Sequence, residues 1–124
     1  FNHTISAWDV STVNNMEFMF REAKAFDQDI GGWDVSQVTT MKMMFHFASA
    51  FNKPLGGWDV SRVTTLYCTF DEAVKFNQPL GHWDVSKIDA SSGGFHQSES
   101  HLHPYPTPLF YCFVAFQKLS DHLY

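Results

Sequence analysis

Residues 33–45 read W-D-V-S-Q-V-T-T-M-K-M-M-F, and the same stretch returns with few changes at residues 8–20 and 58–70. A fourth copy begins with W-D-V-S at residue 83. The tryptophans of the chain are therefore 25 residues apart; they are Trp8, Trp33, Trp58 and Trp83. A fixed period of this length is typical of proteins built from stacked structural repeats.

The repeated unit is longer than the quoted stretch. A phenylalanine lies seven residues before each tryptophan, at Phe1, Phe26, Phe51 and Phe76. We assign residues 1–94 to a repeat array whose units begin at the four tryptophans, residues 95–105 to a decayed capping unit and residues 106–124 to a non-repeat C-terminal tail. Because Phe1 falls in the middle of a unit, we expect the chain to be a piece of a longer array.

Within one unit, two periods of apolar residues follow each other. Trp33 and Val35 alternate with polar residues, which is typical of a strand with one buried face. Four apolar residues then recur with the spacing of one helix face; they are Met41, Met44, Phe45 and Ala48. The position just before this segment holds residue types that cap helix N-termini, namely Asn14, Thr39, Thr64 and Asp89. Each unit is therefore predicted to form a strand, a short helix and a turn.

A unit of this size cannot bury its own apolar face, so stacking of units is the physical solution. The predicted fold is an α/β solenoid, similar to a leucine-rich repeat, with stacked strand-helix-turn units of 25 residues and a short parallel sheet. Equivalent side chains then lie above one another. We expect one ladder of the four tryptophans and a second of Phe20, Phe45, Phe70 and Phe95.

The pattern W-D-V-S-x-V-T-x-M-x-x-M-F-x-x-A-x-x-F-N, found over residues 1 to about 95, resembles the repeat of the BspA-type bacterial leucine-rich-repeat surface proteins. The resemblance implies a cell-surface or secreted protein that acts in adhesion or protein-protein binding. It also implies a protein or glycan partner of unknown identity. The family offers no catalytic residues to transfer.

Composition sets further bounds. The chain has 124 residues, of which 44% are apolar and 17% charged, enough for one globular domain. A net charge of -5 without a basic stripe argues against a nucleic-acid partner. The longest apolar run, residues 109–116, is too short to form a transmembrane segment. Two cysteines, Cys68 and Cys112, provide no disulfide framework, and whether they pair stays open.

One variable position inside the repeated motif is a candidate for partner binding. It holds Thr12, Gln37, Arg62 and Lys87 in successive units. These polar side chains are expected on the surface, where each unit would present different chemistry to a partner while the core stays the same. The alternative is a solvated face that is free to vary.

Two groups of residues could bind a metal. Stacked carboxylates at Asp9, Asp34, Asp59 and Asp84 could hold calcium, or could accept hydrogen bonds from neighbouring Ser, Thr or backbone groups. His96, His101 and His103, near Glu99, could bind zinc, or could belong to a polar tail. A calcium- or zinc-binding protein is therefore the alternative function.

No arrangement of residues indicates catalysis. The repeated serines follow Asp-Val in each unit and never form a G-x-S-x-G elbow, and no phosphate-binding glycine loop is present. We therefore predict a non-enzymatic structural or interaction module that has no catalytic residues and no cofactor.

Overall fold

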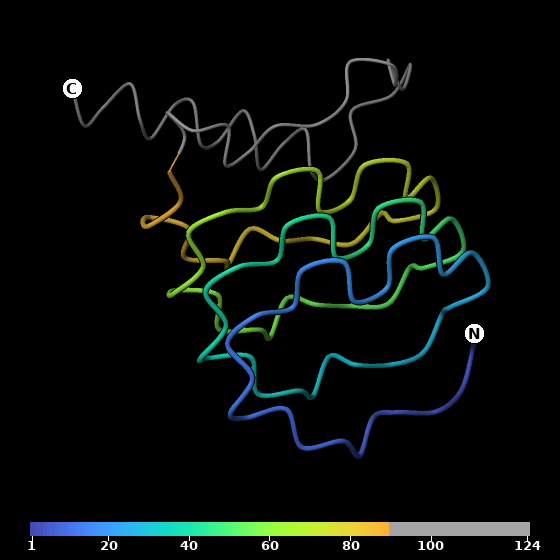
Figure 1. Cartoon of the computed structure of the whole chain (residues 1–124), viewed down its shortest axis with the longest axis horizontal. Coiled ribbons are helices and arrows are strands. Elements are labelled where there is room, and N and C mark those ends of the chain that lie inside the picture. The colour runs from blue at the N-terminus through green and yellow to red at the C-terminus, as the bar shows by residue number, and fades with distance from the viewer. Residues whose placement is uncertain (90–124) are drawn as a thin grey trace.

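The chain winds into consecutive coils that lie one above another, as the blue, green and yellow segments of Figure 1 show. In this computed structural model the described residues are 1–89. They form coil 1 (residues 1–25), coil 2 (26–50), coil 3 (51–75) and the first part of coil 4 (76–89), each beginning at a phenylalanine. One coil is therefore one sequence repeat.

The coils contain neither helices nor extended strands. Residues 1–89 form turns and irregular backbone, and their bridge pairing is limited to two isolated parallel bridges, Asn15 with Thr40 and Thr40 with Thr65. The predicted α/β solenoid of leucine-rich-repeat type, with strand-helix-turn units and a parallel sheet, is therefore wrong for this part of the chain.

The predicted helix does not form because the N–H groups of this segment donate hydrogen bonds to carbonyls of the next coil. In an α-helix each N–H bonds to the carbonyl four residues earlier. Here alternate N–H groups of coil 1 reach coil 2 instead: Met16 N donates to Thr40 O (3.1 Å), Phe18 N to Lys42 O (3.0 Å), Phe20 N to Met44 O (2.8 Å) and Glu22 N to His46 O (2.7 Å). The same pattern joins coils 2 and 3.

Left-handed backbone interrupts the helical path a second time. Phe18 and Glu22 have φ of 62° and 60°, and their equivalents in the next coils, Met43 and Phe47, then Cys68 and Glu72, also have positive φ. An L-residue in this region costs about 1–2 kcal/mol and cannot continue a right-handed helix. Each unit therefore makes two successive tight turns, visible as two bends per coil in Figure 1. Two such turns bring apolar residues inward at nearly the spacing of a helix.

The predicted helix caps have a different role. Thr39 donates to Asn14 O through both its N–H (2.8 Å) and its Oγ1 (3.1 Å), and Thr64 bonds to Thr39 O in the same way. The first turn is instead closed one residue later, where Asn15 Oδ1 accepts the N–H of Glu17 at 2.8 Å. These residues therefore join coils and shape turns.

The predicted strand segment is also a pair of turns. Trp33 and Val35 both point inward, as their alternation indicated, and are buried. Their backbone bonds nevertheless stay local, because Trp33 N donates to Ile30 O at 3.1 Å and Val38 N to Val35 O at 2.9 Å. The alternation of apolar and polar residues therefore predicted correctly that Trp33 and Val35 are buried, but these residues do not form a strand of a sheet.

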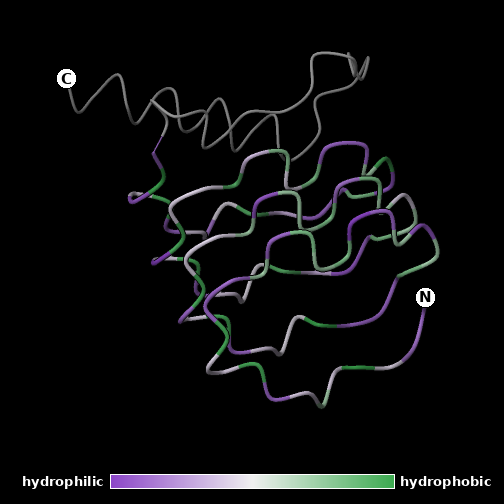
Figure 2. Cartoon of the chain, in the orientation of Figure 1, coloured by the Kyte–Doolittle hydropathy of each residue, from purple (hydrophilic) through white to green (hydrophobic). Residues whose placement is uncertain are grey.

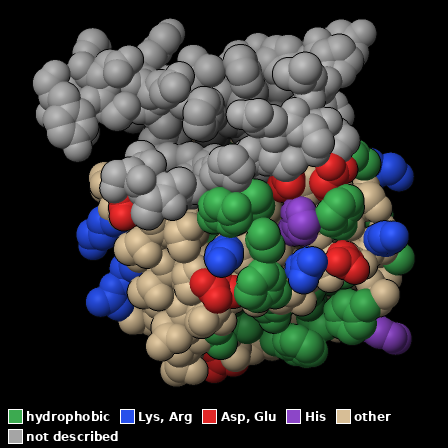
Figure 3. Space-filling view, turned by 45° about the horizontal axis from the view of Figure 1, so that its top comes forward, with side chains coloured by type: hydrophobic (Ala, Val, Ile, Leu, Met, Phe, Trp, Pro, Cys, Tyr) green, Lys and Arg blue, Asp and Glu red, His purple; other side chains and the backbone are tan. Residues whose placement is uncertain are grey.

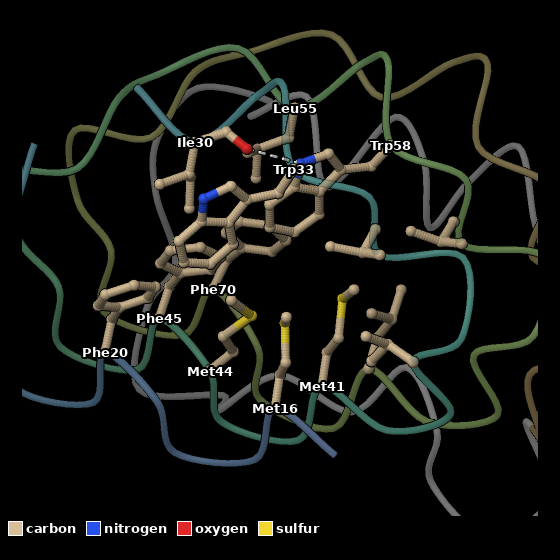
Figure 4. Packing of buried hydrophobic residues seen from close by; sticks show 14 of the residues in the cluster. Met16, Phe20, Ile30, Trp33, Met41, Met44, Phe45, Leu55, Trp58 and Phe70 are labelled. Atoms are coloured by element: carbon tan, nitrogen blue, oxygen red, sulfur yellow. Dashed lines mark hydrogen bonds between the residues drawn. The ribbon is translucent and has the colours of Figure 1, made fainter. Parts of the chain in front are cut away.

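The core lies inside the stack of coils. Figure 2 shows hydrophobic segments at the same place in successive coils, and Figure 4 shows Phe20, Phe45 and Phe70 aligned one behind another. The Phe45 ring is stacked at 5.6 Å from Phe20 and 5.4 Å from Phe70. Burying each such side chain contributes about 1.5–3 kcal/mol. Met41, Met44 and Phe45 are fully buried.

Several predictions concern residues outside the described part of the chain. They are the end of the array at residue 94, the capping unit 95–105, the tail 106–124, the fourth ladder residue Phe95, Cys112, and the His96, His101 and His103 stretch.

Candidate functional site

Tryptophan indoles tie each coil to the one before it. Trp33 Nε1 donates to Ile5 O at 3.1 Å, Trp58 Nε1 to Ile30 O at 3.0 Å and Trp83 Nε1 to Leu55 O at 2.9 Å. Figure 4 shows Trp33 and Trp58 in this arrangement. The rings of Trp8 and Trp33 stack at 6.5 Å, as do those of Trp58 and Trp83. Trp8 is exposed, whereas the other three are buried.

A second ladder runs through the residues that follow the first phenylalanine of each coil. Asn2 Oδ1 accepts the N–H of Asp27 at 3.0 Å, Asp27 Oδ1 that of Asn52 at 3.0 Å, and Asn52 Oδ1 that of Asn77 at 2.9 Å. Gln78 Nε2 also donates to Asn52 Oδ1 at 3.0 Å. The two ladders and the backbone bonds hold the coils in fixed register, so the exposed side chains project from a rigid frame.

The aspartate row is built into turns. Asp34 Oδ1 accepts the N–H of Ser36 at 3.0 Å and its hydroxyl at 2.6 Å, and the Asp9 and Asp59 turns repeat this geometry. These hydrogen bonds, from the serine hydroxyl first and its N–H second, lower the pKa of Asp34, although the neighbouring aspartates oppose the shift. Among residues 1–89, no group of three or more His, Cys, Asp and Glu side chains is placed to hold a metal ion.

The variable row is exposed in all four coils: Thr12, Gln37, Arg62 and Lys87. Arg62 Nη1 donates a hydrogen bond to Gln37 Oε1 of the preceding coil. The side chains of the row are neutral in coils 1 and 2, at Thr12 and Gln37, and basic in coils 3 and 4, at Arg62 and Lys87.

A different surface carries four of the six exposed large hydrophobic side chains of residues 1–89. We call it the double-turn face; it consists of the exposed and half-buried side chains of residues 17–25, 42–50 and 67–75. Phe18 is 43% exposed and Phe47 39%, and Met19 and Val74 are also exposed. Met44, the equivalent of Met19 in the next coil, is fully buried. Figure 3 shows apolar side chains interspersed with basic, acidic and histidine side chains on this side of the molecule.

Cations lie over the rings of this face. Lys42 Nζ is 5.9 Å from the ring centre of Phe18 and 5.6 Å from that of Tyr67, so it joins three coils. Arg21 Cζ lies 5.9 Å from the Phe18 ring. Each such contact at an exposed site contributes about 0.5–1 kcal/mol. The aromatic rings are thereby held in place although they are not in the core.

Beneath the face, a buried pair links coils 2 and 3. His46 Nε2 lies 3.3 Å from Asp71 Oδ2, and little of either side chain reaches solvent. His46 Nδ1 is buried without a hydrogen-bond partner, and the imidazole packs edge-on against Phe47 at 4.5 Å. The pairing with Asp71 therefore holds the His46 imidazole against which the Phe47 ring packs.

Cys68 takes the position held by Phe18 and Met43 in the preceding coils and is buried as a small apolar side chain. Burial raises the pKa of its thiol, and the Asp71 carboxylate adds to this shift. Within residues 1–89 the thiol has no disulfide partner. A buried thiol of raised pKa is a poor nucleophile.

The double-turn face was not identified in the sequence, although the repeat contained a signal for it. Core positions keep one residue type, as at Phe20, Phe45 and Phe70, whereas surface positions change class between units. The position of Glu22, Phe47 and Glu72 alternates between acidic and aromatic, which indicates exposure. Comparing units position by position would have marked this position as exposed, but it would not have separated Phe18, which is exposed, from its buried equivalent Cys68.

No helix of residues 1–89 is long and apolar enough to cross a membrane. A family model described as "Mycoplasma protein of unknown function, DUF285" matches residues 1–106. No curated protein and no solved structure matches the chain.

Proposed function

This chain belongs to the DUF285 family, whose function is unknown, and we propose that it is a non-enzymatic interaction module of a surface or secreted protein. The module binds a protein partner through the double-turn face. The surface location and the role in adhesion rest on the resemblance of its repeat to that of the BspA-type surface proteins.

The observation that carries this proposal is the composition of the double-turn face. Phe18, Phe47 and Met19 are exposed, and the basic Arg21 and Lys42 lie over the Phe18 ring. Protein interfaces are enriched in aromatic residues, Met and Arg, and their hot spots are aromatic or Arg side chains in rigid surroundings. An apolar surface rimmed by charge is typical of a protein-binding site.

The frame beneath the face supports the same function. Ladder bonds repeat at each junction, whereas the side chains of the face differ from coil to coil, as in Glu17, Lys42 and Tyr67. Binding therefore has little ordering entropy to overcome, because the backbone is already fixed by the stack.

The test is a pair of substitutions that preserve the left-handed backbone. Phe18→Asn and Phe47→Asn remove the rings, and Asn tolerates positive φ. Binding of the whole chain to immobilised fibronectin and laminin, two matrix glycoproteins, is measured by surface plasmon resonance. We expect the double variant to bind at least about tenfold more weakly, which corresponds to about 1.4 kcal/mol.

Three outcomes contradict the proposal. One is the absence of binding of the parent chain to both fibronectin and laminin. Another is equal binding by the double variant and the parent chain. The third is loss of binding when the immobilised proteins are enzymatically deglycosylated, which would identify a glycan as the partner.

The variable row is the second candidate surface. Thr12, Gln37, Arg62 and Lys87 are all exposed and differ in chemistry from coil to coil. The matched variant is Arg62→Gln with Lys87→Gln, which removes both cations of the row and leaves the double-turn face intact. If this variant loses binding and the Asn double variant keeps it, the row is the binding surface.

A further inference from the structure

Lys42 lies in coil 2, the middle of the three coils that form the double-turn face, so a described coil flanks it on each side. Its Nζ is 5.9 Å from the ring centre of Phe18 in coil 1 and 5.6 Å from that of Tyr67 in coil 3. The side chain is half-buried. Contacts with rings of both neighbouring coils therefore hold the ammonium group at one place on the face.

Two acidic side chains of the neighbouring coils bond to other groups. Glu17 occupies the position equivalent to Lys42 in coil 1, and its Oε1 accepts a hydrogen bond from Thr40 Oγ1 at 3.0 Å. Asp71, in coil 3, lies 3.3 Å from His46 Nε2. Lys42 itself forms no ion pair within residues 1–89. Its positive charge is therefore not balanced by a carboxylate of the described coils.

The face has two further lysines, Lys24 and Lys75, which also form no ion pair within residues 1–89. Unlike Lys42, neither lies over an aromatic ring of this part of the chain. An exposed ion pair contributes little, because two flexible side chains lose entropy when they meet. Lys42 has already lost part of that freedom, and a ring face attracts an ammonium group without removing its charge. Of these three lysines, Lys42 therefore binds a carboxylate with the smallest loss of entropy.

Exposed apolar side chains share the face with Lys42. Phe47 is 39% exposed and Val74 48%, and Figure 3 shows basic side chains set among apolar ones on this side of the molecule. The equivalents of Lys42 in the neighbouring coils are Glu17 and Tyr67, so cations do not repeat along the stack. Binding of a polyanion draws on many cations. One cation within an apolar surface instead matches one carboxylate flanked by apolar side chains.

We propose that Lys42 is the anchoring point for a protein partner that presents one Asp or Glu side chain flanked by apolar side chains, an inference that rests on the proposed function of the double-turn face. The partner carboxylate pairs with Lys42 Nζ beside the Phe18 and Tyr67 rings. Its apolar neighbours cover Phe47 and the exposed part of Phe18. These side chains exclude water from the ion pair, which strengthens it relative to a pair at an open surface.

The first test uses a small probe in place of a partner. Lysines of the whole chain are reductively methylated with isotope-labelled formaldehyde and followed by NMR, and Lys24→Arg, Lys42→Arg and Lys75→Arg each assign one resonance. The probe is 3-phenylpropionate, a carboxylate joined to an aromatic ring, and the uncharged 3-phenylpropanamide is the control. We expect the Lys42 resonance to shift to saturation with the carboxylate but not with the amide. The anchor is overturned if Lys42 shifts no more than Lys24 and Lys75, or if the amide has the same effect.

The second test compares Lys42→Gln with Lys53→Gln, which removes one positive charge outside the double-turn face. Binding of the whole chain to immobilised fibronectin and laminin should weaken at least about tenfold for Lys42→Gln and less than about twofold for Lys53→Gln. Lys42→Arg should retain binding, because Arg keeps the charge and stacks on aromatic rings.

The outcomes separate the anchor from the proposed function. Equal losses in the two glutamine variants would overturn the anchor, because the net charge of the chain would then explain them. The anchor alone is overturned if Lys42→Gln binds like the parent chain while the double variant Phe18→Asn with Phe47→Asn does not. The proposed function alone is overturned if the parent chain binds neither glycoprotein and the Lys42 resonance still saturates. A parent dimer that Lys42→Gln dissociates would also overturn the anchor, since a second copy would then be the occupant.

Discussion

Left-handed backbone at residues other than glycine recurs twice in each of coils 1 to 3, and Glu22 is the most accessible example. Its φ is 60° and its side chain is exposed, with a surface ion pair to Arg21 at 3.4 Å. Surface pairs of this kind contribute little. Glu22→Gly should therefore stabilise the chain by about 1 kcal/mol, because relief of left-handed strain exceeds the entropy that glycine adds to the unfolded chain. Chemical denaturation of parent and variant measures the difference.

The matched control is Lys24→Gly. Lys24 is also exposed in coil 1 but has no positive φ. The same change there should destabilise the chain by about 0.5–1 kcal/mol. If both glycine variants are destabilised equally, the backbone at residue 22 is not left-handed in solution.

The six residues with positive φ also show why the tight turns were not predicted from the sequence. Glycine is the usual marker of a left-handed turn, but the six positions hold Phe, Glu, Met, Phe, Cys and Glu. Such residue types gave no turn signal. By contrast, Asp34 and Ser36 lie two residues apart in the sequence. The structure shows Asp34 accepting hydrogen bonds from the N–H and the hydroxyl of Ser36, which is one of the two alternatives predicted for the aspartate row.

At the scale of one coil, the indole bond tests how the coils are joined. Trp58→Phe removes the Nε1 donor to Ile30 O and part of a buried ring. The loss of the hydrogen bond and of buried volume should cost about 1–3 kcal/mol. Trp8→Phe should cost less than about 0.5 kcal/mol, because Trp8 is exposed and its Nε1 has no partner within residues 1–89. Urea denaturation curves of the two variants compare the two costs, and equal losses would contradict the ladder.

The aromatic column gives a second prediction at this scale. Phe45 is fully buried between Phe20 and Phe70, so Phe45→Ala should cost about 3–5 kcal/mol and abolish or nearly abolish folding. Phe47→Ala, two residues away and 39% exposed, should cost less. Circular dichroism at 25 °C together with thermal unfolding distinguishes the two, and similar losses would place Phe47 in the core.

Coil structure could be predicted from the sequence only in part. Inward positions such as Trp33, Val35 and Phe45 followed from their periodicity and are buried. The element type did not follow, because two consecutive tight turns and one short helix bury nearly the same set of residues. The deciding fact is the destination of each N–H, and Phe20 N bonds to Met44 O in another coil. A long-range bond of this kind leaves no local pattern in the sequence.

At the scale of the whole molecule, the aspartate row should set the acid limit of stability. Serine hydrogen bonds lower the pKa of Asp9, Asp34, Asp59 and Asp84 in the folded chain. A lowered pKa means that the unfolded chain binds these protons first, so the stabilisation is present above the unfolded pKa of about 3.9 and is lost as pH falls further. Tm should be nearly constant from pH 7 to 5 and fall below about pH 4.

The control for this prediction is Asp34→Asn combined with Asp59→Asn. These changes remove two of the titrating carboxylates but keep an acceptor for Ser36 and Ser61. The double variant should lose less Tm between pH 5 and 3 than the parent does. An unchanged pH profile would assign the acid sensitivity to other carboxylates.

The sequence predicted best which residues of successive coils lie above one another, and it predicted least well which side chains are exposed at the surface. The 25-residue spacing fixed which side chains lie above one another, because a stack repeats its contacts at the period of its sequence. It did not show that Phe18 and Phe47 lie outside the core, since both resemble core residues in composition. Surface chemistry depends on where each turn places its residues, and this requires the backbone path.

The fixed span of the ladder bonds has a consequence for how genes of this kind can change length. Side-chain bonds between coils join residues 23 to 28 positions apart, as in Asp27 with Asn52 and Ile30 with Trp58. Duplication or loss of 25 codons preserves every such bond. Insertion of one codon between Asp27 and Asn52, by contrast, shifts both the tryptophan indole bonds and the second ladder, of Asn and Asp side chains, out of register. Recombination between repeats is therefore the tolerated route of length variation, and single-codon insertions are tolerated only where a loop absorbs them.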